Sequence, residues 1–343
     1  MAQAPVADCD TTMPPGWWAG PEMAHGGMLS AARALFPEAP WPFLDLSTGI
    51  NPVSYPLPAL PAGALTRLPD AGDELALREV AAAAYGVTDA EMVVAAPGTQ
   101  ILISLLPYLL PVAGRRVAVL SPTYGEHEAA WRTAGFDVSA VADFSGLAGV
   151  DVAVVCNPNN PDGRVIDPAV LAGFGGTLVV DEAFADLEPG GLSVAAALPR
   201  AGLVVLRSFG KSYGLAGVRL GFALAEPSLA ARLRGALGPW AVSGPALAAG
   251  LQALPDAAWR AATVARLDRD TGRLDEMVRR VGMTLVGGTR LFRLYRGDAE
   301  AVFQRLGRAG ILVRRFQAPP DVLRFGLPGD AADWRRLEVV LAG

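Results

Sequence analysis

The chain has 343 residues and an apolar content of 52%, so it can bury a large core, and its length suggests about two domains. Its 39 glycines and 28 prolines stay below the share that is typical of low-complexity chains. The net charge of −5, from 29 basic and 34 acidic side chains, excludes a surface that attracts nucleic acid or an anionic membrane as a whole. We therefore expect a folded protein with no nucleic-acid partner and no membrane partner.

Cysteine and histidine are scarce. Cys9 and Cys156 are too few for a disulfide scaffold, and together with His25 and His127 they show no metal-ligand spacing, so we expect no metal site. The N-terminus lacks a basic stretch followed by an apolar one, which argues against a secretion signal. Residues 92–114 carry no charge, but a turn and two later prolines interrupt them before membrane-spanning length is reached. These features indicate a cytoplasmic protein.

The first 70 residues are rich in proline, glycine and tryptophan, and we expect an N-terminal arm there that also contributes to a small domain. Residues 73–85 have a helical pattern, with Asp70 or Asp73 as cap and Gly86 as stop. Short continuous apolar runs follow, and such runs are typical of strands in a parallel sheet that helices cover on both faces. These runs occupy residues 92–96, 116–120, 151–156, 177–181, 203–207 and 218–224. The pattern predicts a large α/β domain with a mostly parallel sheet over residues 71–250.

Residues 251–343 have a different pattern. Apolar side chains three and four positions apart mark one face of a long helix, namely Val264, Leu267, Thr271, Leu274, Val278 and Val281. A strand at 290–294, a helix at 298–309, strands near 311 and 323, and a final helix capped by Asp330 complete the segment. We expect a linking helix followed by a smaller α+β domain.

Lys211 is the only lysine among the 29 basic residues. A codon bias toward arginine explains the scarcity, but a surviving lysine also marks a position where an amine must lose its proton and attack a carbonyl carbon. It follows the apolar run 203–207, in a glycine-rich loop that also holds Ser208 and Arg219. Gly210, Lys211 and the next serine do not form a P-loop, because that motif needs a glycine where Val205 stands. The loop suits an anionic cofactor whose aldehyde meets the amine.

Asp181 ends another apolar run and therefore lies at the mouth of an expected central strand. A buried aspartate is unfavourable by several kcal/mol unless a cation pairs with it, and a protonated pyridine nitrogen is one such cation. Capping of the following segment is the structural alternative. Three further post-strand loops are weaker signals on their own, and they carry Gly98 with Thr99, Tyr124, and Asn160. Together, an amine, a carboxylate, an amide, an aromatic ring and phosphate-binding groups are the complement that pyridoxal phosphate requires.

These residues carry a resemblance to a known family. The chain resembles the fold-type I pyridoxal-phosphate enzymes, and among them it is similar to the threonine-phosphate decarboxylases of cobalamin biosynthesis. The resemblance includes residues 25–27, residues 45–52, the loops described above, and Leu323 to Phe325. It covers nearly the whole chain. Its motifs are common one by one and specific in combination.

The resemblance implies a role for each candidate residue. Lys211 would bind the cofactor aldehyde covalently, Asp181 would pair with the pyridine nitrogen, Asn160 would bond the phenolic oxygen, and Tyr124 would stack on the ring. The cofactor phosphate would be held by Gly98, Thr99, Ser208 and Arg219. The substrate would be bound by His25, Gly26, Asn51 and Arg324. The family also implies a homodimer with active sites at the subunit interface, acting on a small phosphorylated amino acid.

The chain departs from relatives at three positions. Phe184 stands where aminotransferases of this fold usually carry a tyrosine, which favours decarboxylation. Gly49 replaces an asparagine of the enterobacterial decarboxylases, and Leu68 replaces a tyrosine that reaches the neighbouring subunit's cofactor. The expected reaction is decarboxylation of L-threonine O-3-phosphate. The alternatives are an aminotransferase acting on a phosphorylated amino acid such as histidinol phosphate, and a catalytically silent binding protein with an aminotransferase-like fold.

Overall fold

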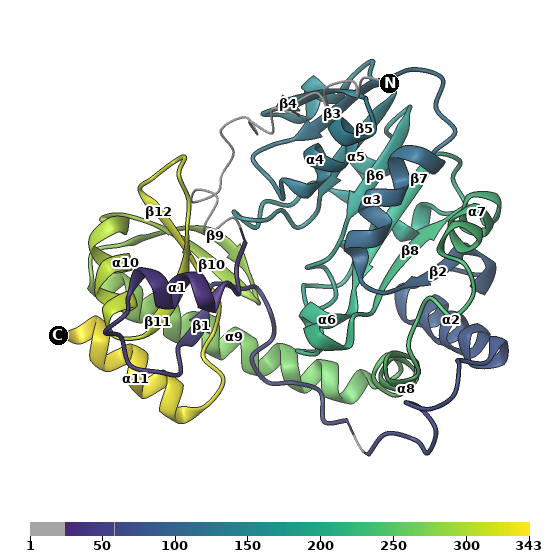
Figure 1. Ribbon diagram of the computed structural model, residues 1–343. Helices are drawn as coiled ribbons and strands as arrows, with labels where there is room; N and C mark the ends of the chain where they lie inside the picture. The colour runs from purple at the N-terminus through teal and green to yellow at the C-terminus, as the bar shows by residue number, and fades with distance from the viewer. Residues whose placement is uncertain (1–24, 58) are drawn as a thin grey trace, which may run out of the picture.

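The structure is a computed structural model that describes residues 25–57 and 59–343 (Figure 1). The start of the expected N-terminal arm, including Cys9, lies outside the described residues. The described part contains a seven-stranded sheet and a five-stranded sheet, and the long helix α9 (Ala257–Arg280) runs from the first toward the second. The predicted fold class is confirmed, whereas the domain boundaries at residues 70 and 250 stay predictions.

The seven-stranded sheet has the strand order β2-β8-β7-β6-β5-β3-β4. Its strands are β2 (Val93–Ala96), β3 (Arg116–Leu120), β4 (Asp137–Val141), β5 (Val152–Cys156), β6 (Thr177–Asp181), β7 (Leu203–Ser208) and β8 (Gly221–Ala225). Neighbouring strands from β4 to β7 pair in parallel, while β8 pairs antiparallel with both β7 and β2. The sheet is therefore mostly parallel, as the continuous apolar runs predicted.

Two elements of this sheet differ from the sequence-based prediction. The expected strand at 218–224 begins only at Gly221, because a short 3₁₀ turn precedes it and Arg219 adopts a left-handed φ of 58°. Strand β4 was not predicted. It lies at the edge of the sheet with mostly exposed or half-buried side chains, so it has no continuous apolar run to reveal it.

Helices cover both faces of this sheet (Figure 1). On one face, α3 (Thr99–Leu109), α4 (Glu126–Thr133) and α7 (Pro227–Leu237) bury apolar side chains against the strands. On the other face lie α2 (Ala71–Tyr85), α5 (Pro168–Ala172) and α8 (Gly244–Ala253). Helix α2 begins where the Asp70 carboxylate accepts a hydrogen bond from the Gly72 amide, and it ends at Gly86, whose φ is 72°. Both ends agree with the sequence-based prediction, because an aspartate cap and a left-handed glycine are the usual signals.

The five-stranded sheet has the order β1-β11-β12-β10-β9. Its strands are β1 (Leu44–Leu46), β9 (Thr284–Thr289), β10 (Phe292–Arg296), β11 (Ile311–Arg315) and β12 (Val322–Phe325), and its helices are α1 (Leu29–Leu35), α10 (Ala299–Arg308) and α11 (Ala331–Ala342). The predicted stripe on α9 packs here, with Leu267, Leu274 and Val278 fully buried. Strand β9 was missed, because it contains two adjacent glycines and no buried residue before Thr289. The residues between β9 and β10 form a tight turn, so β10 starts two residues later than predicted.

None of the helices in the described ranges combines the length and the apolar character that a membrane crossing requires. At the carboxyl ends of the parallel strands, the short helix α6 (Phe209–Ser212) follows β7 directly and carries Lys211. This edge is where open α/β sheets bind ligands, since the loops that leave neighbouring strands converge there.

Candidate active site

A cavity opens at the carboxyl ends of β5, β6 and β7, and residues of the five-stranded sheet complete its wall. It brings together eleven of the twelve residues that the sequence singled out. They are His25, Gly26, Gly98, Thr99, Tyr124, Asn160, Asp181, Ser208, Lys211, Arg219 and Arg324. The convergence of loops that lie far apart in the chain therefore produces one site.

Lys211 extends from α6 into the cavity. Its Nζ atom lies 4.9 Å from the centre of the Phe184 ring, which gives the amine an apolar floor. Burial lowers the pKa of Lys211, although the charge of Asp181 opposes the shift. Because the neutral amine is the nucleophile, this environment favours attack on an aldehyde.

Asp181 lies at the last position of β6 and is buried. Its Oδ2 atom is 2.9 Å from Nε2 of His127, and its Oδ1 atom accepts a hydrogen bond of 3.0 Å from the Ala183 amide. Burial alone would raise the pKa of Asp181, but the bond to His127 and the charge of Lys211 hold it below its usual value. The carboxylate is therefore kept anionic, which is the state that a pyridinium nitrogen needs beside it.

His127 is a site residue that sequence reasoning missed. Its spacing excluded it as a metal ligand, yet it lies three positions after Tyr124, in the first turn of α4. His127, Cys156 and Asp181 place a ring nitrogen, a thiol and a carboxylate oxygen within 4.8 Å of one another. That set could hold a metal ion. We keep the prediction of no metal, because the same carboxylate faces the position expected for the pyridine nitrogen.

A cup that suits a phosphate group forms at the start of α3. Gly98 precedes this helix with φ 87°, and a Cβ atom built on Gly98 would lie 2.5 Å from Nη2 of Arg219. The positive φ favours glycine at this position, and the missing side chain leaves room for the guanidinium beside the helix start. Thr99 and Ser208 line the same cup. Backbone N–H groups at a helix N-terminus, a hydroxyl and a guanidinium are the donors that a phosphate group requires.

Tyr124 lines the cavity next to this cup. Its hydroxyl donates to Oε1 of Gln100 at 3.0 Å, and its ring meets the His127 ring edge-on, with centroids 6.1 Å apart. These two contacts fix the ring plane. Tyr124 can therefore present a flat face to a bound aromatic group, as predicted from the resemblance.

Asn160 and Arg324 contact each other across the cavity. Nη1 of Arg324 donates to Oδ1 of Asn160, and Nη2 donates to the Ser47 carbonyl oxygen at 2.8 Å. Arg324 comes from β12 and Asn160 from the loop after β5, so this bond joins the two sheets. It also orients the Asn160 amide, whose NH₂ group is the donor for a phenolic oxygen.

Arg314 is a second cavity residue that sequence reasoning missed. It is the cross-strand partner of Arg324, so two buried guanidinium groups face the same cavity. Burial lowers the pKa of Arg314 to about 10, and burial together with the Arg314 charge lowers the pKa of Arg324 to about 9. The run Ile311 to Arg315 contains no local signal for this role, because only the strand pairing brings the two arginines together.

His25 and Gly26 lie at the rim of the cavity. Nε2 of His25 is 3.3 Å from Oε1 of Glu126, and a Cβ atom on Gly26 would lie 2.5 Å from the Ser47 carbonyl oxygen. Gly26 therefore packs tightly against Ser47, the residue that follows β1.

Asn51 is the one predicted site residue that does not line the cavity. It is buried, and its side chain donates to the Ser212 carbonyl oxygen at 2.9 Å and accepts from Nη2 of Arg266 at 2.6 Å. Its backbone amide donates to the Lys211 carbonyl oxygen at 2.9 Å. In this chain, Asn51 thus holds the turn that carries Lys211 and has no surface toward the cavity.

Comparison with known proteins agrees with this geometry. Residues 54–337 match the model of the aminotransferase class I and II family. Threonine-phosphate decarboxylases from Pseudomonas aeruginosa and a Sinorhizobium species are each 46% identical to the chain, over 94% and 93% of it and 98% of each relative. A histidinol-phosphate aminotransferase from Stenotrophomonas maltophilia is 34% identical over 89% of this chain and 90% of its own length.

A solved structure of an aminotransferase also resembles this fold. The crystal structure of a histidinol-phosphate aminotransferase from Sinorhizobium meliloti, in complex with pyridoxal 5'-phosphate, superimposes with a TM-score of 0.78 at 20% identity. That match covers 99% of this chain and 98% of the other. The buried amine, the anionic Asp181 and the cup at Gly98 fit the same cofactor. The chain therefore belongs to the pyridoxal-phosphate-dependent class I and II aminotransferase family, in the branch that contains the threonine-phosphate decarboxylases.

Proposed function

We propose that this protein decarboxylates L-threonine O-3-phosphate to (R)-1-amino-2-propanol O-2-phosphate and CO₂, as a cytoplasmic step of cobalamin biosynthesis. The observation that carries the proposal is the pair Arg314 and Arg324, which face the cavity that also holds Lys211. Relatives that are 46% identical over nearly the whole chain have the same activity in their names.

Two neighbouring guanidinium groups favour the binding of anions. Like charges directly opposite each other on neighbouring strands destabilise a sheet, and burial makes the repulsion stronger. A substrate with both a carboxylate and a phosphate offers one anionic group to each guanidinium, and guanidinium groups bind both through paired hydrogen bonds. An amino acid without the phosphate would offer only one anionic group to the pair. The pair therefore favours a phosphorylated amino acid.

Each site residue then has a chemical task. When bound, pyridoxal phosphate supplies a ring that accepts the electron pair released when a bond to the substrate α-carbon breaks. Asp181 would hold a proton on the ring nitrogen, because its carboxylate stays anionic in the buried site. Lys211 would hold the cofactor aldehyde through its amine, and the same amine would be placed to return a proton to the substrate α-carbon.

Orientation decides which bond breaks. The guanidinium groups of Arg314 and Arg324 would set this orientation by holding the carboxylate and the phosphate, and so would determine whether the carboxylate or the α-hydrogen leaves. Phe184 contacts the Lys211 amine with its ring face and offers no hydroxyl in this region. We infer that this arrangement favours loss of CO₂ over transamination.

The test uses purified protein reconstituted with pyridoxal phosphate. Incubation with L-threonine O-3-phosphate should release CO₂ and an equal amount of the phosphorylated amine, with no consumption of added 2-oxoglutarate. Consumption of the keto acid with histidinol phosphate would instead identify an aminotransferase. Cofactor binding without turnover of either substrate would identify a silent binding protein. The Lys211→Ala variant should lose the covalently bound yellow cofactor.

We also propose that two copies form a homodimer. Large apolar side chains are exposed near the start of α2 and in the loop before α8, namely Leu65, Leu68 and Trp240, with exposed fractions of 78%, 67% and 56%. Trp240 also has a left-handed φ of 61°, which is unfavourable for a bulky residue. Light scattering on the purified protein should give twice the mass of one chain, and Trp240→Asp should shift it toward a monomer.

A further inference from the structure

We propose that the buried ionic network of Glu182, Arg207 and Asp186 is a positioning element for the cofactor site. It holds Asp181 and Ser208 in register from the opposite face of the seven-stranded sheet. The proposal requires only that the cavity binds pyridoxal phosphate, and it holds whichever amino acid is the substrate.

The network lies directly behind the site residues. Asp181 and Ser208 end the parallel neighbours β6 and β7, and both line the cavity. Glu182 and Arg207 are their immediate chain neighbours, and neither lines the cavity. Because successive side chains of a strand point to opposite faces, the two charged groups meet beneath the sheet.

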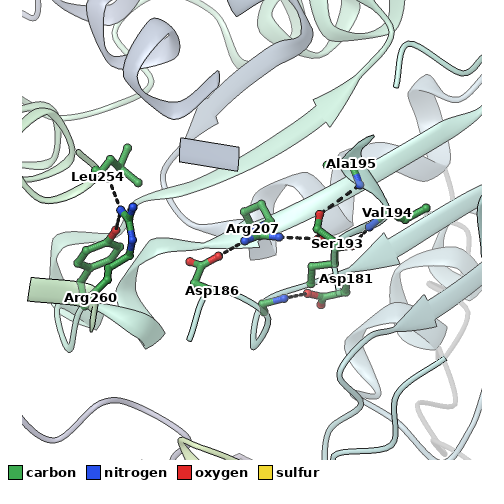
Figure 2. Close-up of polar contacts among 11 residues, drawn as sticks. Asp181, Asp186, Ser193, Val194, Ala195, Arg207, Leu254 and Arg260 are labelled. Carbon is green, nitrogen blue, oxygen red and sulfur yellow. Dashed lines mark hydrogen bonds and ion pairs between the residues drawn. The ribbon is translucent and has the colours of Figure 1, made fainter. Parts of the chain in front are cut away.

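Glu182 is completely buried and is held by three donors. Its Oε2 atom accepts from Nη1 of Arg207 at 2.5 Å and from Oγ of Ser193 at 2.6 Å, while Oε1 accepts from the Val194 amide at 2.7 Å. Ser193 in turn accepts from the Ala195 amide at 3.1 Å. Figure 2 shows this arrangement, with Ser193 on one side of Arg207.

Arg207 links Glu182 to a second carboxylate. Its Nη2 atom donates to Asp186, on the other side of the guanidinium in Figure 2, and the guanidinium carbon lies 4.7 Å from the centre of the Tyr85 ring on α2. The arginine side chain is 8% exposed. It is therefore clamped by two carboxylates and an aromatic face, and it cannot move without breaking several contacts.

A buried ionic network of this kind contributes little to the net stability of a protein. Removing charged groups from water is expensive, and apolar residues of similar size often replace a buried ion pair without loss. We infer that the network acts by fixing the positions of the site residues. Asp181 is expected to hold the ring nitrogen, and Ser208 is expected to hold the phosphate. Lys211, three residues after Ser208, is expected to bind the aldehyde. A bridge between the ends of β6 and β7 fixes the spacing of these three anchors, and errors of about 1 Å at such anchors are costly.

The experiment compares Glu182→Gln and Arg207→Lys with a matched control, Asp275→Asn. Glu182→Gln removes the charge, and Arg207→Lys keeps it but cannot span both carboxylates with a planar fork. Asp275 also pairs with an arginine, Arg293, through two bonds of 3.0 and 2.6 Å, but it lies on α9 and its partner lies on β10 of the five-stranded sheet. The readouts on holoenzyme are the dissociation constant of pyridoxal phosphate, the visible circular dichroism of the bound cofactor, and Tm.

We expect Glu182→Gln to weaken cofactor binding at least tenfold and to reduce the visible circular dichroism, and Arg207→Lys to have a smaller effect of the same kind. Asp275→Asn should lower Tm and leave both cofactor readouts unchanged. The proposal is overturned if both network variants bind the cofactor as the wild type does, or if the control loses cofactor affinity equally. If Glu182→Gln does not fold, Arg207→Lys decides. An inert threonine phosphate would contradict the proposed reaction and leave these binding measurements valid.

Discussion

A Cβ atom built on Gly49 would lie 2.8 Å from Cε1 of Phe184, so these two residues are direct packing partners beneath Lys211. The same Cβ atom would lie 3.0 Å from Cδ1 of Phe292, whose ring meets Phe184 edge-on. From the sequence, Gly49 and Phe184 were two separate departures from relatives. In the structure they are linked, because the absence of a side chain at residue 49 makes room for the ring that supports the amine.

Gly49→Ala should therefore push Phe184 away from Lys211. Overpacking of a filled core is unfavourable by about 1–3 kcal/mol, and the displaced ring should lower kcat by about tenfold. Urea unfolding and steady-state kinetics measure the two effects. Gly272→Ala is the matched control, since Gly272 lies in α9 with open space around it, and it should leave kcat unchanged. Unaltered kcat in Gly49→Ala would mean that the ring position does not matter.

Gly98→Ala should weaken cofactor binding by at least tenfold. The added methyl group would collide with the Arg219 guanidinium, and the φ of 87° is strained for alanine. Equilibrium dialysis with pyridoxal phosphate measures the affinity. Arg219→Lys should have a related effect without backbone strain, because lysine lacks the forked donor geometry. If Gly98→Ala retains full affinity, the phosphate group is bound elsewhere.

Arg314→Met should raise the KM for threonine phosphate about tenfold or more, because it removes one of the two anion partners. Arg315→Met is the matched control. That neighbouring arginine contacts Glu300 at 3.2 Å near the surface and does not line the cavity. Steady-state kinetics should show a normal KM for the control. Equal effects of the two substitutions would contradict a specific role of Arg314.

The pair of His127 and Asp181 predicts a pH-dependent contribution to stability. Burial alone would lower the pKa of His127, but Cys156 and the bond to Asp181 raise it to about 10. A group whose pKa is raised by folding stabilises the folded state fully at pH values below its pKa in the unfolded chain, which is about 6.5 for histidine. This stabilisation disappears as the pH rises to the pKa in the folded protein. The lowered pKa of Asp181 acts in the opposite direction, so its contribution is lost as the pH falls below about 4.

His127→Gln should therefore destabilise the cofactor-free protein by about 3 kcal/mol at pH 6, and by clearly less at pH 9.5. Urea unfolding at the two pH values measures the difference. His25→Gln is the control. His25 is half-exposed and contacts Glu126 at the rim of the cavity, so its loss should change stability little at either pH. A destabilisation by His127→Gln that does not depend on pH would exclude the charged pair.

Short-range patterns along the chain were sufficient for most of the architecture. Continuous apolar runs marked the buried strands, and Asp70 and Gly86 marked the ends of α2. The single lysine marked an amine that lines the cavity. Each of these signals lies within a few residues. Exposed edge strands such as β4 and β9 have no such signal. Asp181 and Ser208 could be placed because strand ends of a parallel sheet meet at one edge.

Contacts between residues that are distant in the chain determined the features that the sequence did not predict. Arg314 and Arg324 become neighbours through the pairing of β11 with β12, His127 reaches Asp181 from another helix, and Asn51 turns away from the cavity to hold the Lys211 turn. The residues next to each partner in the sequence give no signal of these contacts. They depend on where the whole chain places groups that are tens or hundreds of residues apart, because burial and electrostatic coupling act through space.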